Sequence, residues 1–175
     1  TLTEQGEPVK MSKRYGRVYT LDDLLDEVGA DVVRFFLLMR GISTHLEFDL
    51  TLAREQSEKN PVFYLQYAHA RICSVFDNAT EKGIKLLDNP DLTLLKNKYE
   101  IDLIKLLTKF PNVIRNSAEK FEIQIIPEYL RELAQAFHAF YHECRIIGVE
   151  ENLQQARLWL CKATRTVLRN GLTIL

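Results

Sequence analysis

The chain has 175 residues, of which 46% are hydrophobic and 27% charged, as in an ordinary soluble globular protein with a real core. The formal net charge of -1 excludes a globally basic surface, so any contact with RNA has to rest on a local basic patch. No apolar run approaches the roughly 20 residues of a membrane span, and the first ten residues lack the apolar core of a signal peptide; we therefore expect a cytoplasmic protein without a membrane partner.

The first twenty residues have the composition of a loop, with a short strand conceivable at residues 17–19. Residues 10–14 read KMSKR, in which two lysines three positions apart flank a serine. Ammonium groups in such a loop can bind a polyphosphate. A lysine-rich loop is more often simply solvated, so both interpretations stay open on this pattern alone.

Two helices are predicted between the loop and residue 59. Thr20 can cap a helix that runs to Val28, and Gly29 suits its C-terminal cap. The apolar residues that follow predict a largely buried helix ending near Gly41. Residues 42–49 then have the character of a connection.

From Leu50 onward the pattern is helical almost throughout, with interruptions expected near Gly83, Pro90, Pro111, Pro127 and Gly148. One helical stripe is predicted to face a core and consists of Leu130, Leu133, Ala134, Phe137, Tyr141 and Cys144. The last helix is predicted from Gln154 to Leu172, ending at Gly171. The predicted fold class is therefore all-α, an antiparallel helical bundle, divided into 1–20 (loop), 21–59 (connecting helices) and 60–175 (bundle).

The most informative stretch begins with Asn60 as a helix cap and Pro61 in the first turn. At about 100° per residue, one sector of this helix is apolar, and Tyr64, Tyr67 and Arg71 line a narrow sector beside it. Two aromatic rings and a guanidinium can stack on splayed bases and contact a phosphate of single-stranded RNA. The alternative is that the tyrosines only complete the edge of the core.

A second basic stripe is predicted on the last helix, where Lys162, Arg165 and Arg169 stand at i, i+3 and i+7. This stripe could contact an RNA backbone, or it could be a solvated face that stabilises the helix terminus. The pattern supports the interpretation as a solvated face at least as well as the interpretation as an RNA contact.

Metal binding is not expected. Cys73, Cys144 and Cys161 are far apart without a CxxC pair, and we expect reduced, buried thiols. His138 and His142 are one turn apart, but HExxH is absent and no third ligand is apparent. His138 is expected to be a surface or interhelix residue.

Two strings of the chain resemble class Ia aminoacyl-tRNA synthetases. Residues 10–13 resemble the KMSKS signature, with Arg14 in place of the final serine, and residues 29–35 are similar to the helix that follows it in these enzymes. Residues 60–71, NPVFYLQYAHAR, resemble the NPxYYxQYAHAR segment of arginyl-tRNA synthetases, with Phe63 in place of the first tyrosine. Residues 129–141 and 156–172 resemble later helices of the same family.

The resemblance implies roles for particular residues. Lys10 and Lys13 would be the catalytic lysines that contact ATP phosphates, and Met11 and Ser12 would complete the ATP-binding loop. In that family the helix at residue 60 presents side chains to the anticodon loop, which here implies Tyr64, Tyr67 and Arg71 as RNA-binding residues.

The resemblance also implies a complete enzyme that uses ATP with Mg to activate arginine and transfers it to tRNA(Arg), without DNA as a partner. The oligomeric state of that enzyme stays open, and a monomer is one alternative. This chain lacks the HIGH signature, so we expect it to be inactive alone and to bind no cofactor. Two alternatives stay open: another class Ia synthetase, such as the cysteinyl or methionyl enzyme, or a noncatalytic helical module that binds RNA or another partner.

Overall fold

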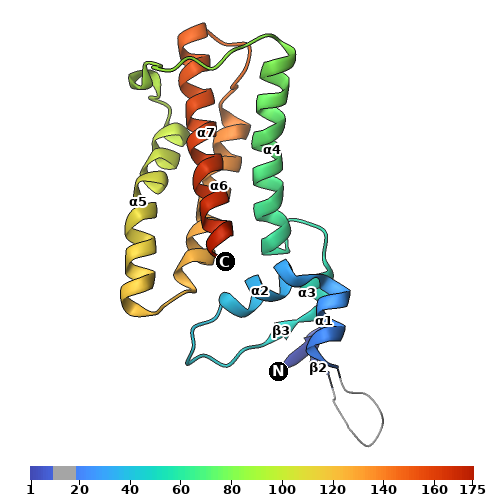
Figure 1. The fold of residues 1–175 in the computed structure, drawn as a ribbon. Coiled ribbons are helices and arrows are strands. Elements are labelled where there is room, and N and C mark those ends of the chain that lie inside the picture. Colours follow the sequence, from blue (N-terminus) through green and yellow to red (C-terminus); the bar gives the residue numbers. More distant parts are fainter. Residues whose placement is uncertain (10–18) are drawn as a thin grey trace, which may run out of the picture.

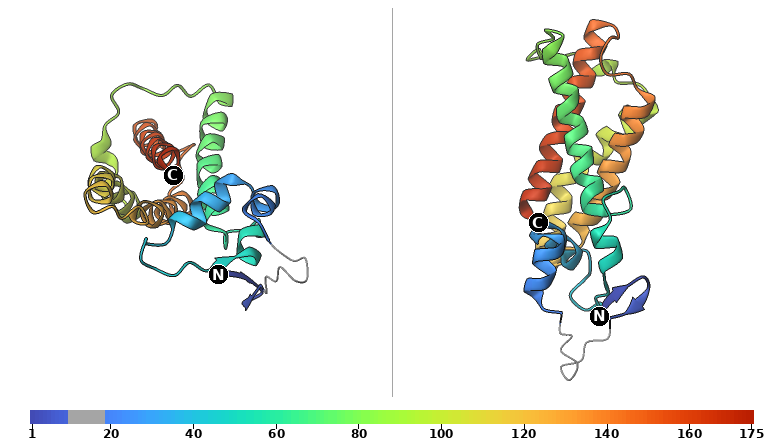
Figure 2. Two further views of the ribbon diagram at one scale, coloured as in Figure 1. Left: turned by 60° about the horizontal axis from the view of Figure 1, so that its bottom comes forward. Right: turned by 90° about the vertical axis from the view of Figure 1, so that its right-hand side faces the viewer.

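The structure is a computed structural model that describes residues 1–9 and 19–175, and helices dominate this part of the chain (Figure 1). The elements follow in the order β1 (Leu2–Glu4), β2 (Glu7–Pro8), α1 (Leu21–Val28), α2 (Ala30–Leu38), β3 (Phe48–Asp49), α3 (Leu50–Arg54), α4 (Pro61–Glu81), the 3-10 helix η2 (Leu92–Leu94), α5 (Lys98–Lys120), α6 (Ile125–Glu143) and α7 (Glu151–Ile174). The long helices α4 to α7 form an elongated bundle, and the strands and helices α1 to α3 lie at one end of it (Figure 2). The all-α prediction is confirmed. Within the described residues, no helix has both the length and the apolar character that a membrane crossing requires.

Helix α1 has the predicted boundaries because its two ends are fixed by local contacts. The hydroxyl of Thr20 accepts a hydrogen bond from the amide of Asp23 (3.1 Å), and the carboxylate of Asp23 accepts one from the amide of Thr20 (2.8 Å). This reciprocal arrangement satisfies two amides that a helix start leaves free. Gly29 ends the helix with a φ of 84°, a backbone angle that other residues rarely adopt.

A small sheet corrects the prediction of loops at residues 1–9 and 42–49. Strand β1 lies in the middle, antiparallel to β2 with Thr3 opposite Pro8, and parallel to β3 with Leu2 opposite Phe48. The strands are too short to show an alternating pattern, and the parallel partner is distant in the sequence. The strand expected at residues 17–19 falls mostly outside the described residues, and Tyr19 belongs to no element.

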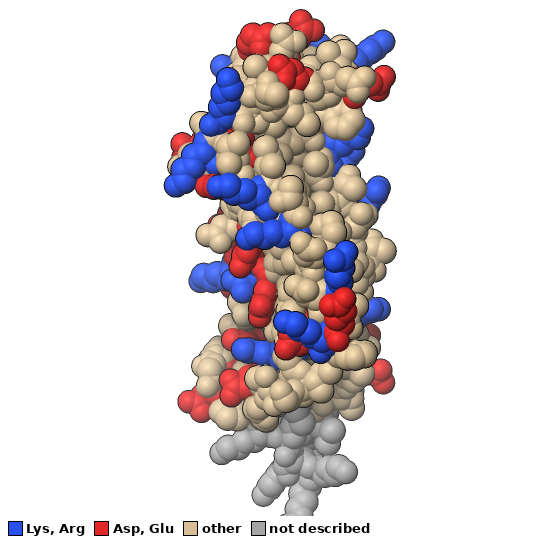
Figure 3. All heavy atoms as spheres, turned by 90° about the vertical axis from the view of Figure 1, so that its left-hand side faces the viewer, with Lys and Arg blue, Asp and Glu red and all other residues tan. Residues whose placement is uncertain are grey.

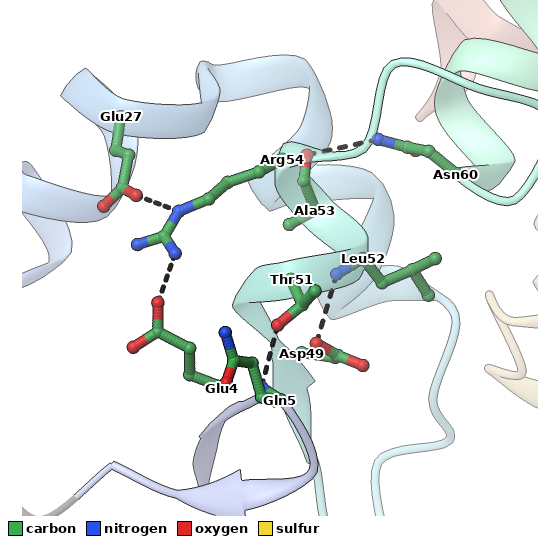
Figure 4. A network of polar contacts seen from close by, with 9 residues as sticks. All are labelled: Glu4, Gln5, Glu27, Asp49, Thr51, Leu52, Ala53, Arg54 and Asn60. Carbon is green, nitrogen blue, oxygen red and sulfur yellow. Dashed lines mark hydrogen bonds and ion pairs between the residues drawn. The ribbon is translucent and has the colours of Figure 1, made fainter.

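Helix α3 connects this sheet to α1 through polar contacts (Figure 4). The guanidinium of Arg54 forms ion pairs with Glu27 of α1 and Glu4 of β1. The hydroxyl of Thr51 accepts a hydrogen bond from the amide of Gln5 (2.8 Å). These pairs are partly exposed, so they orient the elements more than they stabilise them.

Helix α4 begins as predicted, at a buried asparagine. The side-chain oxygen of Asn60 accepts a hydrogen bond from the amide of Val62 (3.0 Å), while its side-chain nitrogen donates to the carbonyl of Ala53 (3.2 Å). Pro61 occupies the first turn, where no amide donor is needed. The predicted apolar sector is confirmed at its centre, where the fully buried residues are Leu65, Ala68 and Ile72.

The interruption predicted near Pro111 is wrong, because α5 continues through this residue. A proline removes one hydrogen bond from a helix, but its ring is exposed here and α5 packs along α6 on both sides of it. The hydroxyl of Tyr129 on α6 donates to the carbonyl of Leu106 on α5 (3.0 Å). Pro127 lies in the first turn of α6, where proline is compatible with a helix.

The predicted end of the last helix at Gly171 is also wrong, because α7 continues to Ile174. Gly171 is buried against α6, and a Cβ atom at this position would lie 2.5 Å from Cδ2 of Leu130. Gly171 therefore permits a close approach of two helices instead of ending one.

A buried ion pair links α5 to α7. Glu100 is completely buried, and its carboxylate accepts hydrogen bonds from Nε of Arg157 (2.7 Å) and from the amide of Asn97 (2.8 Å). Nη1 of Arg157 also donates to the carbonyl of Arg145 (2.6 Å). The pair thus fixes α5, α7 and the connection that follows α6 in one arrangement.

The face in Figure 3 carries lysine and arginine intermixed with aspartate and glutamate. This is the side on which α5 lies in Figure 1. A broad patch of positive charge is not visible on it, so this face lacks the electrostatic character of a nucleic-acid surface.

Candidate functional site

The seam between α4 and α6 carries aromatic rings around one guanidinium group. The guanidinium carbon of Arg71 lies 4.5 Å from the ring centroid of Tyr67 and 4.7 Å from that of Tyr141. Nη2 of Arg71 also donates a hydrogen bond to the phenolic oxygen of Tyr67. A cation is attracted to the face of an aromatic ring. Arg71 is thus held across the seam by one ring from each helix.

His138 of α6 fills the space between the three predicted residues of α4. Its Nδ1 lies 3.4 Å from Nη1 of Arg71, and its ring centroid lies 4.8 Å from that of Tyr64 and 5.6 Å from that of Tyr67. Burial, and then the positive charge of Arg71, lower the pKa of His138. A neutral imidazole that accepts a hydrogen bond at Nδ1 carries its proton on Nε2. His138 is therefore an interhelix residue, one of the two locations expected for it.

Tyr64 stands between this cluster and a groove of ≈ 660 Å³. Burial is the main reason why the pKa of the Tyr64 hydroxyl is raised. The charged residues of the groove are of both signs: Glu58, Lys59, Glu128, Arg131 and Glu132. The groove therefore lacks the uniform positive potential that favours a phosphate.

Tyr141 corrects the prediction that its whole stripe faces the core. Leu130, Leu133 and Phe137 are completely buried as predicted, but Tyr141 is 39% exposed. A cleft of ≈ 330 Å³ opens beside it, between the middle of α4 and the end of α6. The end of the stripe thus lies at this cleft, where Tyr141 and Cys144 belong to its lining.

The structure brings Tyr64, Tyr67 and Arg71 together, as the sequence predicts, and adds Tyr141 and Phe63 to them besides His138. Tyr141 was assigned to the core, and Phe63, whose ring is stacked 6.5 Å from Tyr67, was noted only as a departure from a motif. The distance from Arg71 to α6 is a tertiary relationship that no spacing in the sequence reveals. Half-buried rings, together with a guanidinium that forms only two hydrogen bonds to side chains of the described residues, can bind an unstacked base and a phosphate.

The stripe on α7 lies on the other side of α4. Nζ of Lys162 is 4.0 Å from the centroid of the Trp159 ring system, and the guanidinium carbon of Arg165 is 4.5 Å from that of Phe76 on α4. Arg169 is exposed. Two of the three cations thus cover aromatic rings, and the stripe is separate from the seam.

The α7 stripe also acts on a histidine of α4. Burial, with smaller effects of Arg165 and Arg169, lowers the pKa of His69.

Two further predictions concern ligands. The expected ATP-binding loop, with Lys10, Met11, Ser12 and Lys13, lies outside the described residues. Among the residues that the structure does describe, no group of three or more His, Cys, Asp or Glu could hold a metal ion. His138 and His142 diverge, since His142 bonds to Glu143 (2.9 Å) on the exposed side of α6.

The cysteines are free thiols, and two of them are buried as predicted. Cys144 is 2% exposed and Cys161 is completely buried, whereas Cys73 is only partly buried. Burial raises the pKa of the Cys161 thiol to about 12, so this group stays protonated and unreactive at neutral pH.

Comparison with known proteins identifies the helical bundle. Residues 65–175 match the family model described as the DALR anticodon binding domain. The chain is 57% identical to an arginine–tRNA ligase of Salinibacter ruber over 175 residues, which is 100% of this chain and 31% of that protein. It is 51% identical to an arginine–tRNA ligase of Geobacter metallireducens over 177 residues, again 100% of this chain and 32% of that protein.

A solved structure agrees with the sequence comparisons. A Campylobacter jejuni structure described as an arginyl-tRNA synthetase has a TM-score of 0.84 and 32% identity, covering 99% of this chain and 37% of that one. The chain spans about a third of the length of the curated relatives it matches. The matched domain is one that binds tRNA anticodons. The chain therefore belongs to the DALR anticodon-binding domain family and is similar along its whole length to arginine–tRNA ligases.

Proposed function

We propose that the chain is the tRNA-reading part of an arginine–tRNA ligase, and that the seam between α4 and α6 binds the anticodon loop of tRNA(Arg). The observation that carries this proposal is the position of Arg71 between the rings of Tyr67 and Tyr141, on the surface of an anticodon-binding domain. The anticodon loop offers unstacked bases to the rings and phosphates to the guanidinium.

The hydrogen bonds of Arg71 leave part of its binding capacity free. A guanidinium has five N–H groups, and the structure assigns one bond to Tyr67 and one to His138. Tyr64 and Tyr67 are each partly buried, so part of each ring is held by its neighbours and part is accessible to a base. A site held in place before binding loses less conformational entropy when RNA binds.

For the complete enzyme, we propose activation of arginine with ATP and Mg in the cytoplasm, followed by transfer to tRNA(Arg). Lys10 and Lys13 would contact the ATP phosphates, with Met11 and Ser12 in the same loop. The same proposal divides the chain into domains after residues 20 and 59. It also gives the complete enzyme a monomeric state and no DNA partner. Replacing Lys10 or Lys13 by alanine in the complete enzyme should lower arginine-dependent exchange of pyrophosphate into ATP. Undiminished exchange in these variants would contradict the role of the two lysines, and no exchange by the unmodified complete protein would favour a noncatalytic module.

The RNA site can be tested by titrating the 175-residue chain with the anticodon stem-loop of tRNA(Arg) and with a noncognate stem-loop. Tyr67→Ala should weaken cognate binding about 5- to 100-fold, the range for loss of one stacked base. Arg71→Ala should weaken binding and reduce its dependence on salt, since a phosphate contact releases counterions.

Two variants serve as matched controls. Arg115 is an exposed arginine on α5, and Phe121 at the end of α5 is 81% exposed. Arg115→Ala and Phe121→Ala remove a guanidinium group and an aromatic ring from α5, outside the seam, and should leave binding unchanged. Equal affinity for the two stem-loops, or full affinity in Tyr67→Ala and Arg71→Ala, would overturn the proposed function.

A further inference from the structure

We propose that His138 is the positioning residue of this RNA site: its imidazole, supplied by α6, holds Tyr64, Tyr67 and Arg71 of α4 in the arrangement that RNA meets. This inference rests on the proposed function. It follows from the observation that one side chain contacts all three residues, through two ring contacts and one hydrogen bond.

The direction of the hydrogen bond defines what His138 supplies. A guanidinium can only donate, so Nδ1 of His138 is the acceptor for Nη1 of Arg71. Tyr64 and Tyr67 flank the imidazole, at interplanar angles of 50° and 25°, and restrict its rotation. The guanidinium is then fixed by the phenolic oxygen of Tyr67 on one side and by the imidazole on the other.

Stability alone does not account for a histidine at this position. Nε2 of His138 is buried and forms no hydrogen bond of regular geometry within the described part of the chain, and the backbone of Tyr64 is the polar group that approaches the imidazole. A buried donor without a partner destabilises the folded state, and an apolar ring of similar shape would avoid this cost. We therefore expect that the imidazole is not needed for stability, whereas within the described residues it supplies an acceptor on α6 for Arg71.

Two substitutions separate the ring from the acceptor. His138→Phe keeps an aromatic ring between Tyr64 and Tyr67 but removes the acceptor. His138→Asn removes the ring but places an amide oxygen near the position of Nδ1. Binding of the tRNA(Arg) anticodon stem-loop to the 175-residue chain, and the Tm of each variant, are the two measurements.

We expect His138→Phe and His138→Asn to rank in opposite order in the Tm measurement and in the binding measurement. His138→Phe should have a Tm equal to or above that of the unmodified chain and bind the stem-loop about 10-fold more weakly, as for a lost hydrogen bond to a charged group. His138→Asn should have a lower Tm but bind more tightly than His138→Phe. In addition, the effects of His138→Phe and Arg71→Ala should not be additive, because the first acts through the second residue.

The inference and the proposed function fail in different ways. Full affinity of His138→Phe, or losses of affinity that simply follow the losses in Tm, would overturn the positioning role while the unmodified chain still prefers the cognate stem-loop. Additive effects of His138→Phe and Arg71→Ala would overturn it as well. Equal binding of cognate and noncognate stem-loops by the unmodified chain would overturn the proposed function itself.

Discussion

The guanidinium carbon of Arg71 on α4 lies 4.7 Å from the ring centroid of Tyr141 on α6. This contact joins two helices at a surface, since Tyr141 remains 39% exposed. The candidate RNA site is consequently a property of the helix pair and not of α4 alone. Changes on α6 should therefore alter RNA binding without any change in α4.

Replacing Tyr141 tests this directly. Tyr141→Ala removes one of the two rings that hold Arg71 and should weaken binding of the tRNA(Arg) stem-loop about 5- to 100-fold, in the range for an aromatic stacking partner. Tyr141→Phe keeps the ring face and should bind nearly as the unmodified chain does. Isothermal titration calorimetry of both variants gives the comparison, and equal affinities for Ala and Phe would argue against a role of the ring.

Gly171→Ala should destabilise the bundle by about 1–3 kcal/mol, the usual cost of an extra carbon in a tightly packed contact. The added Cβ would lie 2.5 Å from Cδ2 of Leu130, so either the buried Leu130 side chain or one of the two helices has to move. Urea unfolding measures the difference. Asn170→Ala, on the exposed neighbour, is the control and should change stability little. An unchanged stability of Gly171→Ala would contradict the close approach of the two helices.

Arg157→Leu should be strongly destabilising because it leaves the carboxylate of Glu100 buried without its cation. The expected loss is about 3–5 kcal/mol, the cost of breaking a buried ion pair from one side. The double variant with Glu100→Leu should recover part of this loss. Lys105→Ala, which breaks an exposed pair with Asp102, should have almost no effect in the same thermal unfolding experiment.

Stability should fall as the pH drops below about 6.5. Burial, assisted by nearby arginines, lowers the pKa of His138 and His69 from their ordinary value of 6.5. Below pH 6.5 the unfolded chain therefore binds protons that the folded chain binds only at lower pH, and stability decreases with falling pH. The carboxyl groups of Asp23 and Glu150, whose pKa values hydrogen bonds lower, act at still lower pH.

The measurement is urea unfolding at pH 7 and pH 5.5. The unmodified chain should lose stability between these two values, and His138→Asn should lose less because one of the two groups is absent. His142→Asn, at an exposed histidine, is the control and should lose as much stability as the unmodified chain. A loss of stability as large in His138→Asn as in the unmodified chain would show that His138 does not contribute.

Features encoded by neighbouring residues were predictable from the sequence. The cap formed by Thr20 and Asp23 and the start of α4 at Asn60 and Pro61 depend on contacts within a few positions. The three candidate RNA residues on α4 share one sector through helical periodicity alone. A resemblance to a known family then indicated which of the open alternatives to prefer.

Features set by tertiary packing were not predictable in this way. Pro111 and Gly171 are helix breakers by local rules, but packing against α6 keeps α5 and α7 helical through them. Strand β1 pairs with β3 far along the chain. Tyr141 has the spacing of a core residue, but it lines a cleft and is 39% exposed.

The central claim is that the seam between α4 and α6 binds the anticodon loop. The most direct measurement is photo-crosslinking of the 175-residue chain to a tRNA(Arg) anticodon stem-loop with 4-thiouridine in its loop, followed by identification of the linked peptides. We predict crosslinks in residues 61–81 and 125–143, which carry Tyr67, Arg71 and Tyr141. Crosslinks confined to α5, or to the α7 stripe with Arg169, would contradict the claim.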